Sequence, residues 1–274
     1  MTDSTFLTRV VLQRYRSIEA CDVKLGPLTF LVGPNGAGKS NFIDGLRFVS
    51  DALRTSLDHA IRDRGGVNEI RQRSARRQRS FGLRLEFRFP TDRGATRGHY
   101  AVRIVAGERN SFSIDSEECI IYRDEEPIAE YRIENGKLVH QRSTLYSDNA
   151  RVALPPVAPD RLYLVTVSGF PGFRAAYDAL SRMGFYNLQP DKIRDLQQPD
   201  AGELLARDGS NLASVLGELA ATNASAKETV EDYLRLIVPG LMSVERIEVG
   251  PRESLEFIQE VNEKRAPWHF TATN

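Results

Sequence analysis

The sequence predicts an α/β fold in which an N-terminal lobe carries an antiparallel β subdomain and is followed by a mainly helical section. Three observations support this prediction. An apolar run, Leu28–Val32, leads through a glycine-rich loop into a long amphipathic segment. Segments with period-two alternation fill much of residues 81–140, and helical periodicity returns after residue 173.

Length and composition are those of an ordinary globular chain. The 274 residues are 41% hydrophobic and 27% charged, with 37 basic and 37 acidic side chains. This length allows one large domain or two modest ones, and the composition excludes a disordered or collagen-like chain. No apolar run reaches the roughly 20 residues that span a bilayer, and the N-terminus lacks the pattern of a signal peptide. We therefore expect a cytoplasmic protein.

The first elements follow from local pattern. Residues 6–13 are apolar and β-branched and predict a strand, and Ala20–Leu25 alternates and predicts a second. Leu28–Val32 is typical of a buried strand that ends at Gly33. Apolar residues spaced by three and four predict one helix from Lys39 to about Arg62, which the pair at residues 65–66 (Gly-Gly) ends.

The middle of the chain predicts an antiparallel meander across residues 81–140. Four alternating segments support it: Phe81–Phe89, Tyr100–Val105, Cys119–Tyr122 and Ile128–Ile133. The proline-rich stretch Leu154–Pro159 is expected to be a connector.

The last third predicts helices and then returning strands. The helices are expected at Phe173–Met183, Ser210–Ala221 and Thr229–Ile237, the last with Val230, Leu234 and Ile237 on one face and a capping box of Ser225 and Glu228. Strands are expected at Ser243–Val249, Ser254–Val261 and Trp268–Thr273. We therefore expect a lobe with the meander at 1–150, a helical section at 151–240 and returning strands at 241–274.

One motif indicates chemistry. Gly33-Pro34-Asn35-Gly36-Ala37-Gly38-Lys39-Ser40 satisfies G-x-x-x-x-G-K-[ST] between an expected strand and an expected helix. Glycines let successive backbone N–H groups converge on phosphate oxygens, and a helix N-terminus adds partial positive charge. Lys39 is expected to reach the β- and γ-phosphates of ATP, and the Ser40 hydroxyl to bind Mg²⁺. The expected nucleotide-binding residues are Gly33, Asn35, Gly36, Ala37, Gly38, Lys39, Ser40 and Asn41.

Other classes of protein fit less well. A small GTPase would need an NKxD motif; although Asp63–Gly66 matches DxxG, no NKxD exists in the chain. A small-molecule kinase would not place a meander directly after the loop helix. The two cysteines, Cys21 and Cys119, are expected to be reduced thiols. The four histidines are expected to be structural or surface residues: His59, His99, His140 and His269.

The segment from Gln13 to Leu46 resembles the N-terminal lobe of RecF/SMC-type ATPases, the ABC-like heads that include the OLD family and many AAA family ATPases of bacteria. The similarity is carried by Gln13-Arg-Tyr-Arg-Ser-Ile-Glu and by Leu25-Gly-Pro-Leu-Thr-Phe-Leu-Val followed by the glycine-rich loop. Residues 183–216 look like the middle section of the same group. The resemblance implies a P-loop lobe, ATP hydrolysis and nucleotide-dependent pairing of two heads.

Two parts of such heads are missing. The resemblance implies a signature motif and a Walker B strand ending in Asp-Glu, yet no four apolar residues precede Asp-Glu in this chain. Ile120–Glu126 is the nearest match, and Arg123 interrupts it. In the family the signature follows a strand like Trp268–Thr273, so we expect the chain to stop just before it. We therefore expect ATP·Mg²⁺ binding with little turnover.

Further residues are candidates by the same resemblance. Arg14, Arg16 and Ser17 occupy a turn that approaches the nucleotide in similar heads, and a plain surface turn is the alternative. Gln189 is a candidate γ-phosphate sensor, against a connecting turn between helices. Arg64 and Arg71 are candidate contacts for DNA or phosphate.

An arginine cluster suggests a partner. The chain has 31 arginines and 6 lysines, counted from the sequence, and five arginines fall within nine residues that contain no acid: Arg71, Arg73, Arg76, Arg77 and Arg79. Guanidinium groups bind phosphates bidentately, so DNA is a possible partner, against a solvated loop. The chain is thus expected to be the ATP-binding portion of a RecF-like ATPase in DNA repair, chromosome handling or phage defence. A non-hydrolysing subunit of a split complex and a nucleic-acid-binding module are the alternatives.

Overall fold

The computed structural model describes residues 6–72, 79–91, 94–123, 125–143, 154–158, 161–260 and 268–272. The chain divides into two compact units, residues 1–183 and 184–274. The section expected at 151–240 is shared between them, since helices α4 and α5 lie in the first unit and α6, α7 and α8 in the second. No helix in the described ranges has the length and apolar character to cross a membrane.

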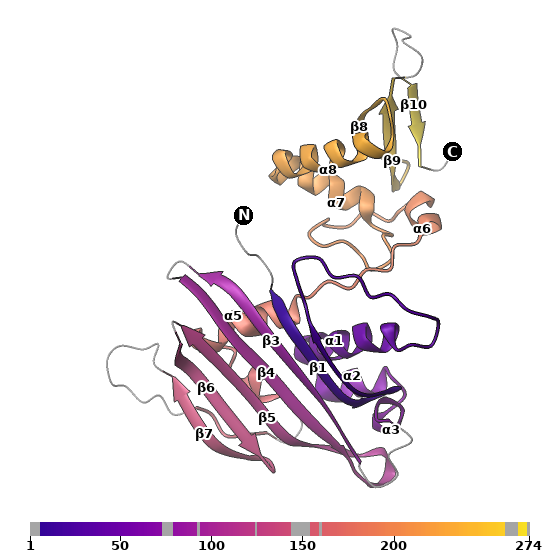
Figure 1. The fold of residues 1–274 in the computed structure, drawn as a ribbon. Helices are drawn as coiled ribbons and strands as arrows, with labels where there is room; N and C mark the ends of the chain where they lie inside the picture. Colours follow the sequence, from indigo (N-terminus) through magenta and orange to yellow (C-terminus); the bar gives the residue numbers. More distant parts are fainter. Residues whose placement is uncertain are drawn as a thin grey trace. The chain divides into compact units, whose positions relative to one another are not determined.

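A seven-stranded antiparallel sheet forms the body of the first unit (Figure 1). Its spatial order is β2 (Ile18–Lys24), β1 (Leu7–Tyr15), β3 (Ser80–Thr91), β4 (Gly94–Ala106), β5 (Phe112–Arg123), β6 (Glu126–Glu134) and β7 (Lys137–Ser143). The predicted antiparallel meander and the mixed α/β class are confirmed. The structure adds β7 to the meander and pairs the β1–β2 hairpin with β3, so that both regions share one sheet.

The sheet has one buried face and one open face. Alternate residues of β3, from Phe81 through Leu83 and Leu85 to Phe87, are at most 3% exposed. The helices α1 (Lys39–Arg54) and α5 (Pro171–Ser181) cover this face (Figure 1). Gly45 of α1 allows a close approach to β1, because a Cβ atom there would lie 3.1 Å from the Leu12 side chain. Arginine and glutamate side chains occupy the other face.

The predicted single helix from Lys39 to Arg62 is wrong, since the chain breaks between α1 and α2 (Leu57–Arg62). Thr55 leaves the helical conformation, and the Ser56 hydroxyl then caps α2 by accepting a hydrogen bond from the His59 N–H at 3.0 Å. The apolar spacing continues across the break because both helices bury the same side. As predicted, glycine ends this helical region: Gly65 and Gly66 both have positive φ before the short α3 (Val67–Ile70).

The predicted buried strand at Leu28–Val32 is not a strand in the structure. Leu28, Phe30 and Val32 are 74%, 77% and 90% exposed, and no described strand pairs with the segment. An apolar run of this kind forms a buried strand only where other elements cover it. Burial depends on neighbouring strands, and none of the described strands lies beside it.

A buried carboxylate ties the start of a short helix to the sheet. Glu117 of β5 is 1% exposed and accepts hydrogen bonds from the Tyr131 hydroxyl at 2.8 Å and from the Tyr163 and Leu164 backbone N–H groups at 2.7 and 3.0 Å. Those N–H groups open α4 (Tyr163–Val167), a short helix that the sequence did not predict. Burial raises the pKa of Glu117 in spite of these donors.

The second unit combines helices with a three-stranded antiparallel sheet. Its elements are α6 (Pro190–Arg194), α7 (Leu212–Thr222), α8 (Ala224–Ile237), β8 (Leu241–Val249), β9 (Arg252–Gln259) and β10 (Trp268–Thr271). The core contains Ala213, Leu216, Leu241, Val244 and Leu255. Two of the three predicted helices and all three predicted strands fall here, within a few residues of their expected bounds.

Two details of α8 correct the sequence prediction. Its N-cap is Asn223, whose side-chain oxygen accepts from the Ala226 N–H at 3.1 Å, and not Ser225 of the predicted capping box. Leu234 packs against the core, whereas Val230 and Ile237 are 38% and 77% exposed. The face that α8 turns inward instead carries Glu231, which is 8% exposed and accepts from Lys227 at 2.8 Å.

Candidate functional site

The loop Gly33–Ser40 makes a tight backbone turn directly before α1. Gly36 and Gly38 adopt φ of +82° and +95°, a conformation that side chains with a Cβ rarely accept. The Phe42 N–H donates to the Gly38 carbonyl at 2.8 Å, so helical bonding begins at the end of the loop. Glycine at these positions is therefore required by the backbone, as the motif predicts.

Lys39 holds the loop closed. Its ammonium group donates to the carbonyl oxygens of Gly33 at 2.7 Å and Pro34 at 2.8 Å, across the mouth of the turn. An ammonium group has three N–H donors, so one remains for an anion. The side chain thus both shapes the loop and places a positive charge inside it.

The first turn of α1 offers further anion donors. Gly38 caps the helix without a side-chain hydrogen bond, and α1 has no acidic residue in its first turn. The first N–H groups of a helix have no intrahelical partner, and they carry the positive end of the helix dipole. The loop, the lysine and the start of the helix therefore bring together groups that are suited to bind phosphate.

The other predicted nucleotide-binding residues of the loop are exposed. Asn35, Gly36, Ala37 and Ser40 are exposed at the loop surface. Within the described ranges, no cluster of histidine, cysteine and carboxylate side chains could hold a metal. The Ser40 hydroxyl offers one oxygen ligand, which fits Mg²⁺ that arrives with a nucleotide and keeps its phosphate and water ligands.

The β1–β2 turn lies beside the loop. The Asn41 side-chain amide donates to the Ser17 hydroxyl at 2.6 Å, and a Cβ on Gly38 would lie 3.4 Å from Ile18. Arg16 lies 2.8 Å from the Asp44 carboxylate and adopts φ of +51°. The structure therefore brings Ser17 against the start of α1 and pairs Arg16 with Asp44 further along the helix, while Arg14 donates to the Ser80 carbonyl.

Arg64 does not reach a surface where it could contact DNA. Its guanidinium is 5% exposed, donates to Asp44 at 3.1 Å and Asp51 at 2.9 Å, and lies 5.4 Å from the centre of the Phe48 ring. The prediction of a nucleic-acid contact at Arg64 is therefore wrong, because two carboxylates on α1 hold it inside the fold. No signal in the sequence indicated this pairing, because Arg64 lies 20 positions from Asp44 and on a different segment.

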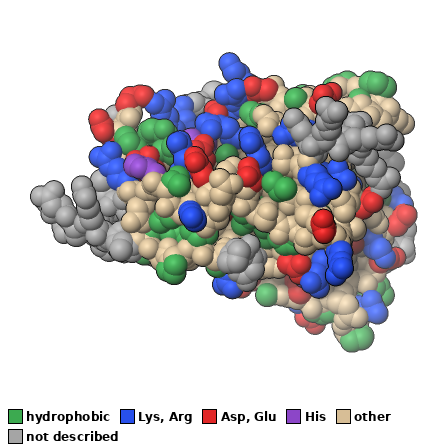
Figure 2. Space-filling view, turned by 90° about the horizontal axis from the view of Figure 1, so that it is seen from below, with side chains coloured by type: hydrophobic (Ala, Val, Ile, Leu, Met, Phe, Trp, Pro, Cys, Tyr) green, Lys and Arg blue, Asp and Glu red, His purple; other side chains and the backbone are tan. Residues whose placement is uncertain are grey.

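The arginine cluster is described only at its ends. Arg71 donates to the Asn68 side chain at 2.9 Å, and Arg79 is exposed. Arg73, Arg76 and Arg77 lie outside the described residues. On the face shown in Figure 2, the described basic and acidic side chains are interspersed, and neither sign forms a continuous patch.

The remaining candidates belong to other elements. Gln189 caps the N-terminus of α6 in the second unit, and its N–H donates to the Asp208 carbonyl at 3.0 Å. Ile120–Glu126 spans the end of β5 and the start of β6, with Glu125 at φ of +71°. That stretch is a β-hairpin of the meander, as its sequence predicted, and no Walker B residue is assigned.

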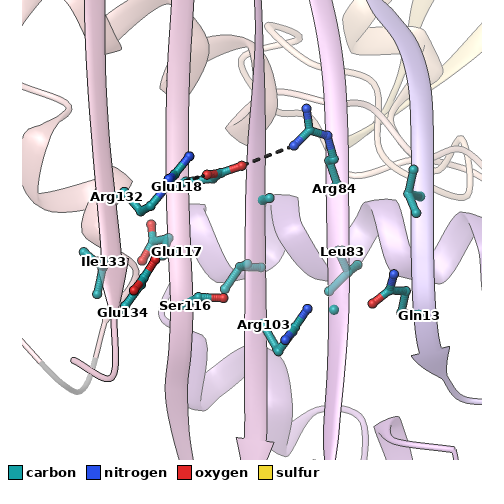
Figure 3. A pocket seen from close by; sticks show the side chains of 14 residues that line it. Gln13, Leu83, Arg84, Arg103, Ser116, Glu117, Glu118, Arg132, Ile133 and Glu134 are labelled. Carbon is teal, nitrogen blue, oxygen red and sulfur yellow. Dashed lines mark hydrogen bonds and ion pairs between the residues drawn. The ribbon is translucent and has the colours of Figure 1, made fainter. Parts of the chain in front are cut away.

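A depression of about 380 Å³, lined by both charged and apolar side chains, lies on the open face of the sheet (Figure 3). The small residues Gly82 and Ala101 form part of its floor. On one side, Glu118 accepts from Arg84 at 3.2 Å and Arg132 at 3.0 Å. This surface was not predicted from the sequence, although the alternating arginines and glutamates of β3, β5 and β6 were its signal.

Two histidines contact carboxylates on this face. His99 lies 2.8 Å from Glu118, and His140 lies 2.8 Å from Glu130. His59 pairs with Asp63 at 3.1 Å on α2. These three histidines are structural or surface residues, as expected, and the side chain of His269 lies outside the described part of the chain.

Comparison with known proteins identifies the relatives of the chain. Residues 28–138 match the family model "AAA domain, putative AbiEii toxin, Type IV TA system". DNA replication and repair protein RecF of Vibrio vulnificus (strain YJ016) is 44% identical over 67 residues, which are 24% of this chain and 18% of that protein. RecF of Vibrio cholerae (strain ATCC 39315 / El Tor Inaba N16961) is 42% identical over 58 residues, 20% of this chain and 16% of the relative.

The OLD nuclease of Thermus scotoductus is 41% identical over 51 residues, 19% of this chain and 10% of that enzyme. The chain thus matches less than a fifth of the length of these curated relatives. The family match includes the Gly33–Ser40 loop and most of the antiparallel sheet. Residues 28–138 are therefore an AAA domain, related over part of its length to RecF and to the OLD nuclease.

Proposed function

We propose that the chain binds ATP together with Mg²⁺ through the Gly33–Ser40 loop. The observation that carries this proposal is the lysine clamp, in which Lys39 joins the Gly33 and Pro34 carbonyls and keeps one N–H donor for phosphate. Loop N–H groups and the start of α1 would bind the phosphate oxygens. Ser40 would contribute one ligand to Mg²⁺, which neutralises phosphate charge when bound.

The wider site is proposed to include Asn35, Ala37, Asn41, Arg16 and Ser17. Ser17 contacts Asn41 at the start of α1, and Arg16 and Ser17 would contact the nucleotide from the β1–β2 turn. In the complete ATPase, hydrolysis would need a Walker B Asp-Glu pair and a signature segment, and neither is assigned to a residue here. We therefore propose that the chain alone binds ATP with little turnover, and that a second head or a separate chain completes the site.

DNA is a further proposed partner, and a cytoplasmic location is proposed with it. RecF is by its name a DNA replication and repair protein, and the 71–79 segment is rich in arginine. Binding through such arginines would weaken steeply as salt increases. Roles in DNA repair, chromosome handling or phage defence all fit; a non-hydrolysing regulatory subunit and a nucleic-acid-binding module remain the alternatives.

The nucleotide proposal is tested by replacing the clamp lysine. We expect Lys39→Ala to weaken binding of a fluorescent ATP analogue by 100-fold or more, about 3 kcal/mol, because a charge-assisted bond to phosphate and the loop clamp are both lost. Fluorescence anisotropy in Mg²⁺, repeated in EDTA, measures the affinity. Lys24→Ala, which removes an exposed lysine of β2, is the control and should bind as the wild type does. Equal binding by Lys39→Ala and wild type would refute the site.

A further inference from the structure

One carboxylate on the loop helix is contacted by three side chains from two segments of the first unit. Asp44 accepts from the Tyr15 hydroxyl at 2.8 Å, lies 2.8 Å from the Arg16 guanidinium and accepts from Arg64 at 3.1 Å. Tyr15 and Arg16 belong to the end of β1 and its turn, and Arg64 follows α2. Asp44 also lies one helical turn beyond Ser40, on the same side of α1.

The three donors differ in how firmly they are held. Arg64 is buried and has other acceptors, the Asp51 carboxylate at 2.9 Å and the Ala60 carbonyl at 3.0 Å. Arg16 is one-third exposed, and among the described residues Asp44 is the carboxylate with which it pairs. Asp44 thus orients the Arg16 side chain. Arg64 would keep its position without Asp44, because Asp51 and Ala60 also hold it.

The turn that carries Arg16 needs such support. Arg14 and Arg16 both have positive φ, at +53° and +51°, which costs energy for residues other than glycine. The Arg16 N–H donates to the Ile70 carbonyl, and the Ser17 hydroxyl accepts from Asn41. Asp44 adds the charged contact that joins this strained turn to the helix of the nucleotide loop.

We propose that Asp44 is a positioning residue for the nucleotide site, acting through Arg16. It holds the β1–β2 turn against α1, so that Arg16 and Ser17 stand at the rim of the Gly33–Ser40 loop before nucleotide arrives. A contact that is already oriented binds more tightly, because less conformational freedom is lost on binding. This inference rests on the proposed nucleotide function and assigns a further residue to it.

A double-mutant cycle tests the proposal. The affinity of the fluorescent ATP analogue is measured for wild type, Asp44→Asn, Arg16→Ala and the double variant. We expect Asp44→Asn to weaken binding about five- to tenfold, and to change it less than twofold when Arg16 is already alanine. An equal effect of Asp44→Asn in both backgrounds overturns the proposal, and so does unchanged affinity. Tighter binding by Asp44→Asn would also overturn it, because Asp44 would then compete with nucleotide for Arg16.

A matched control separates positioning from folding. Asp51→Asn removes the other carboxylate partner of Arg64 and leaves the β1–β2 turn untouched. We expect it to lower the midpoint of thermal unfolding and to bind ATP as the wild type does. If Asp44→Asn does not fold, Tyr15→Phe removes one donor to Asp44 with little change of shape, and we expect it to weaken binding two- to threefold. Wild-type affinity in folded Tyr15→Phe would then overturn the proposal.

The outcomes also separate this inference from the proposed function. If wild type and Lys39→Ala bind the analogue equally, the nucleotide site itself fails and the role of Asp44 fails with it. A second outcome is that Lys39→Ala loses binding while Asp44→Asn has the same effect on affinity with and without Arg16. In that case the nucleotide site is supported and only the role of Asp44 is refuted.

Discussion

Strand β3 and the segment Leu28–Val32 carry similar apolar residues and have opposite surroundings. Phe81 and Leu85 of β3 are fully buried, whereas Phe30 and Val32 are more than three-quarters exposed. Strand β3 lies between β1 and β4 and is covered by α1. No described strand pairs with Leu28–Val32.

The difference shows what an apolar pattern can specify. In β3 the alternating apolar residues are buried, because β1 and β4 pair with the strand and α1 covers it. Their burial contributes to the stability of the first unit. At Leu28–Val32 the same kind of pattern leads into the nucleotide loop and stands open on both sides. The buried strand β3 thus contributes to stability, whereas the exposed segment Leu28–Val32 leads to the candidate site.

The largest effect is expected in the buried region. Phe81 packs edge-on against Tyr15 at 5.9 Å and Phe48 at 5.7 Å between ring centres. We expect Phe81→Ala to lower the free energy of unfolding by about 3–5 kcal/mol, because it leaves a cavity among these rings. Urea unfolding followed by circular dichroism measures the change. A loss below about 1 kcal/mol would show that β3 is not the core of this unit.

An intermediate effect is expected on the open face of the same sheet. His99 and Arg132 lower the pKa of Glu118 to about 2, below the usual 4.5. A lowered carboxyl pKa stabilises the fold above the ordinary pKa and loses this contribution as pH falls from about 5 to 2. We expect Glu118→Gln to cost about 1–2 kcal/mol at pH 7 and to reduce the acid dependence of stability.

Urea unfolding between pH 7 and pH 3 measures this dependence, with Glu134→Gln as the control. Glu134 lies on the same face, two residues along β6 from Arg132, and no ion pair is described for it. It should change stability by less than about 0.5 kcal/mol. If the two variants behave alike, the ion pairs around Glu118 contribute nothing to the stability of the sheet.

The smallest effect is expected in the exposed segment. Because Phe30 is 77% exposed, we expect Phe30→Ser to change the free energy of unfolding by less than about 0.5 kcal/mol. The same urea experiment compares it directly with Phe81→Ala. A large loss in Phe30→Ser would mean that this side chain is buried in solution and that the two regions do not differ.

Local patterns predicted much of the fold. Period-two alternation located β3, β4 and β6, and the glycines at 65–66 marked the end of the helical region. The helix break at Thr55 and the helix cap at Asn223 were not predicted. Each is marked by one side-chain hydrogen bond, and the apolar spacing continues past both positions. Helix α4 was missed because its N–H groups are satisfied by Glu117, which lies 46 residues earlier in the chain.

The sequence by itself determined the glycine-rich loop, its lysine and its serine, since the required residue types and spacing are local. It also determined that the middle of the chain is an antiparallel sheet. Only the tertiary structure showed that Asp44 joins Tyr15, Arg16 and Arg64, and that Arg64 is buried. These contacts join residues 20 or more positions apart, and their formation depends on how α1 packs against the sheet, which no local pattern encodes.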